Sequence, residues 1–377
     1  MPTVPPDSYG AELICDVLTA YRRDLERTPD VVHFGDADAH WLILALQVER
    51  LTAPATGRVS HTSKLAQHRT LRPRSLLKLT EAMESAGALT LAYTTLAAAR
   101  RVWDSADPPS AGIAVFRQAR ICRTFGASQA AENLYSYLFT FATRHRLAEL
   151  RGRALVGKGI MRTIEGDAEA GYRWFAKARA ASGRHPVVVA VSSHGEMAAA
   201  LATEDFSHAL VAGWRALETG ALGSYDEAGV MVNMASISLR AGQSNAALRT
   251  VFSALRATTH ARVRMIAYSK GALAAAQLGR KALVEKFARR LVATAAAGNF
   301  PLDELESRSE LAVAFALVGE TAKARRLARS VRREAQQLEL GIVVRRCDSV
   351  LEGAEVLEQS VELSATARRV VLELEAA

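Results

Sequence analysis

The sequence predicts an all-α fold in which helical hairpins repeat along the chain, and three observations support this. Alanine, leucine and arginine dominate the composition and aromatic residues make up only 6% of 377 residues, which is typical of helices. Few segments show the alternation of β-branched or aromatic residues that strands need. An apolar helix that ends in a glycine-type turn, followed by an alanine-rich helix, recurs at intervals of 37 to 40 residues, as in helical repeat proteins.

Each repeat is marked by a corner residue at which its first helix ends. Glycine adopts the left-handed backbone conformation that ends a helix at little steric cost. At the one exception, Glu204, a polar turn with Asp205 is expected to replace the glycine. The seven corners are Gly87, Gly126, Gly166, Glu204, Gly242, Gly279 and Gly319.

Small or apolar residues recur at three fixed positions around the corners, namely seven before, five after and twelve after, with Thr80 as the one polar member. Residues seven apart share one face of a helix, so these positions predict where the two helices of a hairpin touch. In the hairpin of Gly166 they are Gly159, Gly171 and Ala178, and in the hairpin of Gly242 they are Ala235, Ala247 and Ala254.

This pattern resembles the tetratricopeptide repeat (TPR) superfamily over about residues 72 to 340. The stretch GIMRTIEGDAEAGYRWFAKA, from Gly159 to Ala178, has the small, turn and large residues of the motif, with Phe175 as the large one. The resemblance implies a right-handed α-solenoid of TPR-like hairpins with helical caps at both ends. The interval exceeds the usual 34 residues, and Ala288 and Ala328 stand where the motif has a large residue. We therefore expect longer helices and hairpin packing that differs from that of the TPR family.

The segments that flank the array are also predicted to be helical. Helices are expected over 8–27 and 36–51 before it and over 342–358 and 362–375 after it, and Pro186 and Pro301 suit the first turn of a helix. Terminal units must present a polar outer face. The predicted organisation is an N-terminal helical cap with a basic linker (1–70), an array of about seven hairpins (71–341) and C-terminal capping helices (342–377).

The net charge of +9 permits binding to nucleic acid, anionic lipid or an acidic protein. Between Glu49 and Glu81 the chain has no acidic residue. Part of this stretch, LAQHRTLRPRSLLKL, faintly resembles a helix-turn-helix, but an arginine occupies an apolar position. We interpret it as a solvated basic linker or an anion-contacting surface, with DNA contact as the alternative. Its basic residues are Arg58, Lys64, Arg69, Arg72, Arg74 and Lys78.

A second basic run, AKARRLARSVRREAQ, has the spacing of one helix face. Its arginines lie three and four residues apart, which brings them close together on a helix. We expect this run to form the exposed face of the second helix of a hairpin. The alternative is that it forms a surface that binds an acidic partner. The residues are Arg325, Arg329, Arg332 and Arg333.

Motifs for catalysis, metal binding and nucleotide binding are not found in the sequence. HExxH, GxSxG and paired Cys/His spacings are absent, and GRALVGKG lacks the Ser or Thr that a phosphate loop needs after its lysine. Cys15, Cys122 and Cys347 lie far apart, which suits reduced thiols. A signal peptide and a long apolar run are also lacking. The sequence predicts a cytoplasmic protein that is no enzyme, uses no cofactor or metal and does not insert into membranes.

The resemblance to TPR proteins implies a concave groove lined by the first helices. We expect it to bind a protein or peptide, with arginines anchoring a carboxylate and Asn233 contacting the peptide backbone. The alternative is a transcriptional regulator or peptide sensor whose 58–78 segment contacts DNA, and a homodimer or larger assembly is compatible with either. The groove candidates are Arg120, Arg123, Arg153, His194, Asn233, Ser236 and Arg240.

Overall fold

A computed structural model of the chain describes residues 73–85, 107–297, 300–338, 340–353 and 361–376, with isolated positions between 89 and 100. All regular elements in these ranges are α-helices, as the sequence predicted. The chain divides into two compact units, and each is described by itself. The first contains the chain up to Met161 together with Lys177–His185, and the second contains Arg162–Ala176 and Pro186–Ala377.

The first unit is built around the hairpin of α6 and α7. Its helices are α4 (Pro73–Ser85), α6 (Pro108–Thr124), α7 (Ser128–Arg144) and most of α8 (Ala148–Ile164). Asp107 caps α6 by accepting a hydrogen bond from the Ser110 amide at 3.2 Å, and proline follows in the first turn, where it is tolerated. Val115, Leu138 and Leu150 then pack α6, α7 and α8 together.

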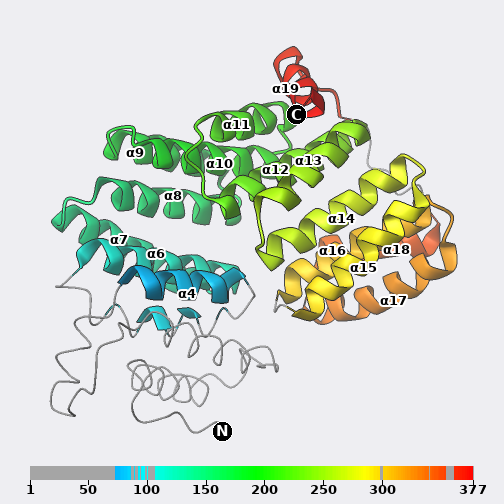
Figure 1. Ribbon diagram of the computed structural model, residues 1–377, viewed down its shortest axis with the longest axis horizontal. Helices are drawn as coiled ribbons and strands as arrows, with labels where there is room; N and C mark the ends of the chain where they lie inside the picture. Colours follow the sequence, from blue (N-terminus) through cyan, green and yellow to red (C-terminus); the bar gives the residue numbers. More distant parts are fainter. Residues whose placement is uncertain are drawn as a thin grey trace, which may run out of the picture. The chain divides into compact units, whose positions relative to one another are not determined.

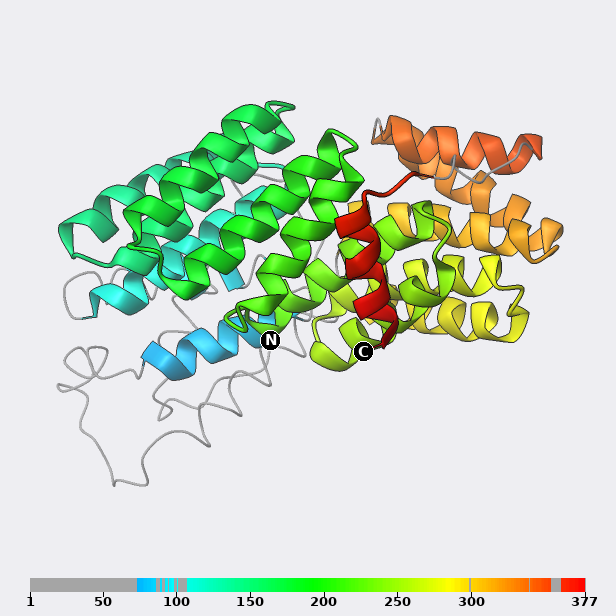
Figure 2. The same ribbon diagram turned by 90° about the horizontal axis from the view of Figure 1, so that it is seen from above.

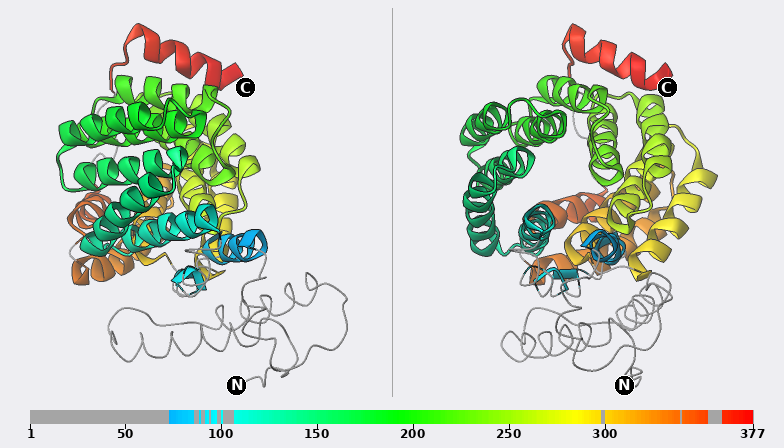
Figure 3. Two further views of the ribbon diagram at one scale, coloured as in Figure 1. Left: turned by 90° about the vertical axis from the view of Figure 1, so that its left-hand side faces the viewer. Right: turned by 60° about the vertical axis from the view of Figure 1, so that its left-hand side comes forward.

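The second unit stacks its hairpins in two layers (Figures 1 and 3). The first helices α10, α12, α14, α16 and α18 each pack against the next one, and α11, α13, α15 and α17 pack between them in a second layer. This is the stacking of an α-solenoid. The bounds are α9 (Ala168–Ala181, divided between the units), α10 (Pro186–Ala202), α11 (Phe206–Glu218), α12 (Ser224–Arg240), α13 (Ser244–Ala257), α14 (Ala261–Gln277), α15 (Lys281–Ala297), α16 (Pro301–Leu317), α17 (Thr321–Gln337), α18 (Gly341–Glu352) and α19 (Ala365–Ala376).

The predicted corners are left-handed turns. Every corner glycine from Gly126 to Gly319 has a positive φ, between 67° and 91°. Glu204 has φ 58°, so it adopts the same conformation as the glycines, and Asp205 caps the next helix. The predicted contact positions around these six corners are all buried. Gly87 lies outside the described residues.

The hairpins pack closely where an aromatic ring meets a glycine. A Cβ on Gly195 of α10 would lie 2.5 Å from the Phe175 ring, which is fully buried. In the hairpin of Gly279, the Phe287 ring of α15 packs instead against Gly271 of α14, the first helix of its own hairpin. The two rings therefore contact different first helices, the following one for Phe175 and the preceding one for Phe287.

The last two helices separate after α18. α18 packs against α16 and α17 and ends at Gly353, which is left-handed. α19 instead packs across α11 and α13 (Figure 2, in red), where Ala367, Val370 and Leu374 join the core around Phe206 and Leu210. The sequence predicted two closing helices, but α19 covers hairpins from the middle of the chain.

No helix in the described part of the chain combines the length and the apolar character needed to cross a membrane.

Candidate binding face of the first helices

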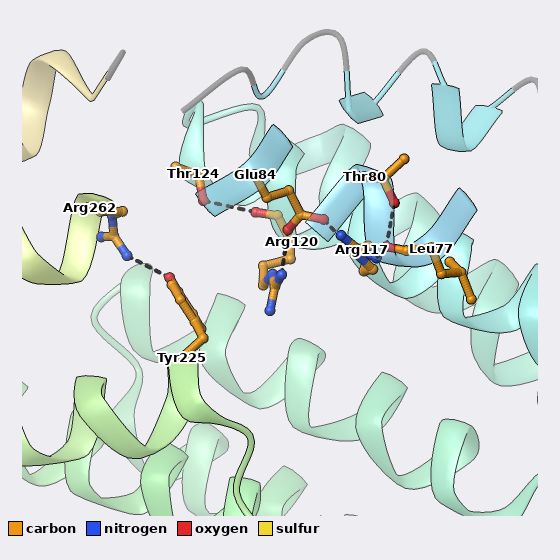
Figure 4. Close-up of polar contacts among 8 residues, drawn as sticks. All are labelled: Leu77, Thr80, Glu84, Arg117, Arg120, Thr124, Tyr225 and Arg262. Atoms are coloured by element: carbon orange, nitrogen blue, oxygen red, sulfur yellow. Dashed lines mark hydrogen bonds and ion pairs between the residues drawn. The ribbon is translucent and has the colours of Figure 1, made fainter. Parts of the chain in front are cut away.

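In the first unit, Arg120, one of the two predicted groove arginines of α6, is bound by a carboxylate of the chain itself. Glu84 of α4 is buried and forms ion pairs with Arg117 at 2.5 Å and with Arg120 (Figure 4). Arg117 also donates a hydrogen bond to the Leu77 carbonyl at 2.6 Å. Burial lowers the pKa of the Arg117 guanidinium, against the opposing effect of Glu84. Glu84 therefore supplies the carboxylate that we expected a ligand to bring to Arg120.

The other two arginines of this unit differ from each other. Arg153 of α8 pairs with Glu149 at 2.8 Å, and its guanidinium lies 5.3 Å from the centroid of the Phe116 ring. Arg123, in the last turn of α6, is half-buried, and no side-chain ion pair or hydrogen bond is found for it in the described part. Of the three predicted arginines, Arg123 is therefore the one that remains available to an anion.

In the second unit, the four predicted residues lie on α10 and α12 and are all half-buried. His194 of α10 faces α12, since a Cβ on Gly229 would lie 3.7 Å from its ring. Ser236 donates a hydrogen bond to the Val232 carbonyl at 3.1 Å. The Asn233 amide has no hydrogen-bond partner among the described residues.

Arg240 ends α12 beside the corner of the preceding hairpin. Its guanidinium lies 4.4 Å from the centroid of the Phe206 ring and 3.7 Å from a carboxylate oxygen of Glu204. Glu204 is largely exposed, and exposed ion pairs contribute little. A carboxylate from a ligand could therefore replace Glu204 at this arginine.

A cluster of charges around the buried Glu310 joins α14, α16 and α18. Glu310 of α16 pairs with Lys270 of α14, accepts a hydrogen bond from Ser269 at 2.8 Å and lies 3.7 Å from Arg346 of α18. Burial opposes ionisation of Glu310, but Lys270, Arg346 and the hydrogen bonds outweigh it and lower the pKa of this carboxyl. Sequence reasoning missed this Glu310 cluster. The available signal was that Lys270 and Glu310 stand at one repeat position, nine before their corners.

A second ionic contact joins the starts of three first helices. Arg262 of α14 donates two parallel hydrogen bonds to Asp303 of α16, at 2.7 and 2.8 Å. It donates a third to the Tyr225 hydroxyl of α12 at 2.9 Å, which Figure 4 shows. Paired geometry of this kind is among the stronger ionic contacts in proteins. It joins the first turns of α12, α14 and α16.

The predicted basic surface lies mostly outside the described residues, namely at Arg58, Lys64, Arg69 and Arg72. Arg74 belongs to α4, and Lys78 is exposed on the same helix. The prediction that this segment contacts an anion or DNA therefore stays a prediction.

The described thiols are poorly placed for chemistry. Cys122 and Cys347 are free and buried, and burial raises the pKa of both, that of Cys347 to about 11. A thiol with a raised pKa stays protonated at neutral pH and is a weak nucleophile. Across the described ranges, no group of His, Cys, Asp and Glu is arranged to hold a metal ion.

Comparison with known proteins adds no relative: no protein-family model matches this sequence, and no curated protein is similar to it.

Proposed function

We propose that this protein is a cytoplasmic, non-catalytic TPR-like module that holds a peptide segment of a partner protein on the first helices of its second unit. The observation that carries the proposal is the half-buried Asn233 amide, which lacks a partner in the described part of the chain. It lies on α12, which packs between α10 and α14. Neither polar atom of the Asn233 amide is among the buried unpartnered atoms of the described residues, so both atoms are open to a ligand.

The chemistry of the neighbouring residues suits an extended peptide. An asparagine amide donates and accepts hydrogen bonds, so it can pair with both the N–H and the C=O of one peptide unit. Ser236 and Arg240 follow at three and seven residues, which places them along the same face of α12. The peptide backbone would bind at Asn233, and an acidic group of the peptide would replace Glu204 at Arg240.

The test is peptide selection followed by substitution. A displayed random-peptide library is selected on the full chain, and the affinity of the recovered peptides is measured by fluorescence anisotropy. Asn233→Ala is expected to weaken binding roughly tenfold, because the hydrogen bonds that this half-buried amide makes to the peptide would contribute about 1.4 kcal/mol. Asn245→Ala is the matched control, since Asn245 is exposed on the second helix α13.

Two results would contradict the proposal. One is that no peptide is enriched over selection on an unrelated helical protein. The other is that Asn233→Ala and Asn245→Ala bind the recovered peptides equally well.

A further inference from the structure

The outward faces of α15 and α17 carry seven cations, which we name the basic face: Lys286, Arg289, Arg290, Arg325, Arg326, Arg329 and Arg333. All seven are exposed, and within the described residues none has an ion pair or side-chain hydrogen bond. The sequence predicted part of this surface on α17 alone. Arg332 does not belong to it, because it turns to Asp348 of α18 at 2.5 Å.

The seven side chains point away from the core. On α15 the buried residues are Val284, Phe287, Ala288 and Leu291, and on α17 they are Ala324, Ala328, Val331 and Ala335. At 3.6 residues per turn, the cations of each helix fall on the side opposite these residues. Each helix therefore presents a cationic stripe to solvent.

Ion pairs join the starts of the two helices that carry these stripes. Lys323 of α17 pairs with Glu285 of α15, and Lys281, at the start of α15, pairs with Glu320 just before α17. Glu285 and Glu320 are thus paired with lysines and do not neutralise the arginines of the two stripes. The stripe from Arg325 to Arg333 spans eight residues, or roughly 12 Å. This is long enough to lie along several base pairs of a duplex, at about 3.4 Å of duplex axis for each phosphate of one strand.

Three features favour the phosphate backbone of duplex nucleic acid as the occupant. Six of the seven cations are arginines, which bind phosphate with two hydrogen bonds. The basic face lacks apolar anchors for a protein, since Val292 is the one large apolar side chain exposed on the described parts of α15 and α17. Phe287, the one aromatic residue of these helices, is buried, so stacking with unpaired bases is not provided.

We propose that the basic face binds the phosphate backbone of duplex nucleic acid without reading its sequence. The surface differs from the face of α10 and α12 that carries the proposed peptide site. Peptide binding and duplex binding can therefore fail independently, and each has its own substitutions.

The experiment measures binding of the full chain to a fluorescein-labelled 20-base-pair DNA duplex of arbitrary sequence over a range of salt concentrations. The test variant combines Arg325→Gln, Arg329→Gln and Arg333→Gln. Its affinity at 100 mM salt is expected to fall at least roughly tenfold, and the slope of log affinity against log salt to become shallower by about 2.7, since each phosphate contact contributes about 0.9. The matched control removes the same charge from exposed positions of other second helices, as Arg144→Gln, Arg173→Gln and Arg256→Gln.

Three outcomes would overturn the proposal. The test variant and the control could show the same affinity and salt slope. Duplex binding could instead be lost when Arg58, Lys64, Arg69 and Arg72 are changed to Gln, which would assign it to the basic linker. A glutamate-rich peptide could bind the basic face more tightly than the duplex at equal salt, which would make the partner an acidic protein.

Discussion

At the scale of single residues, the corners show that a residue other than glycine can adopt the left-handed conformation that the turn requires. Glu204 has the left-handed backbone of the corner glycines although it carries a side chain. The left-handed region costs an ordinary residue roughly 1–2 kcal/mol. The exposed contact between Glu204 and Arg240 offsets little of this cost. The packing of the surrounding helices therefore keeps Glu204 in a backbone conformation that a residue with a side chain disfavours.

Glu204→Gly is expected to stabilise the protein. Glycine removes the steric cost of the left-handed turn, while its greater freedom in the unfolded chain takes back about 0.5–1 kcal/mol. The net gain in the free energy of unfolding is about 0.5–1 kcal/mol, measured from the midpoint of urea unfolding. Gly242→Ala, at the equivalent corner, is the control and should lower the midpoint. A lower midpoint for Glu204→Gly would contradict this account.

At the scale of helices, what the sequence predicted depends on how local the signal is. The corners and contact positions could be predicted because they recur along the chain. At each recurring contact position the residue is small or apolar, which indicates that the position is buried. The place of α19 could not be predicted, because its apolar face fits any apolar surface and α11 and α13 lie far from it in sequence. Likewise, the carboxylates that pair with Arg120 and Lys270 come from residues 36 and 40 positions away, and the spacing of charges alone does not pair them.

Val370→Asp is expected to detach α19 from α11 and α13. Val370 is buried in the core that α19 shares with these helices, and an ionised carboxylate without a partner is costly to bury. Hydrogen exchange of backbone amides in α11 and α13 should become faster, and α19 should become sensitive to protease. Leu372→Asp is the control on the same helix, because Leu372 is 64% exposed. Unchanged exchange in α11 and α13 after Val370→Asp would show that α19 contributes nothing to their stability.

At the scale of the whole molecule, most contacts between helices join elements that are close to each other in the sequence. In the second unit, helices pack against their sequence neighbours, as in a quasi-one-dimensional stack. In such a stack, a local loss of stability spreads mainly to adjacent repeats. The Glu310 cluster joins three successive first helices, whereas α19 joins α11 and α13. The two ends of this unit are therefore stabilised by different contacts.

Glu310→Gln should destabilise the end of this unit in a way that depends on pH. Its carboxyl has a pKa below the ordinary 4.5 in the folded state, so its contribution is fully present above pH 4.5 and disappears as the pH falls through the folded-state pKa. At neutral pH, removing one partner of a buried ionic cluster should cost about 3 kcal/mol. The difference in urea midpoint between Glu310→Gln and the unsubstituted protein should shrink as the pH falls below 4.5.

Hydrogen exchange gives the spatial side of the same prediction. Exchange in Glu310→Gln at neutral pH should accelerate in α14, α16 and α18, which the cluster joins, and change least in α10 and α11. Glu306→Gln is the matched control, because Glu306 is exposed on the same helix. Equal acceleration from α10 to α18 would mean that the second unit unfolds as one cooperative block. Acceleration confined to α14, α16 and α18 would mean that its stability is set repeat by repeat, so that binding on α12 and binding on α15 and α17 could be changed separately.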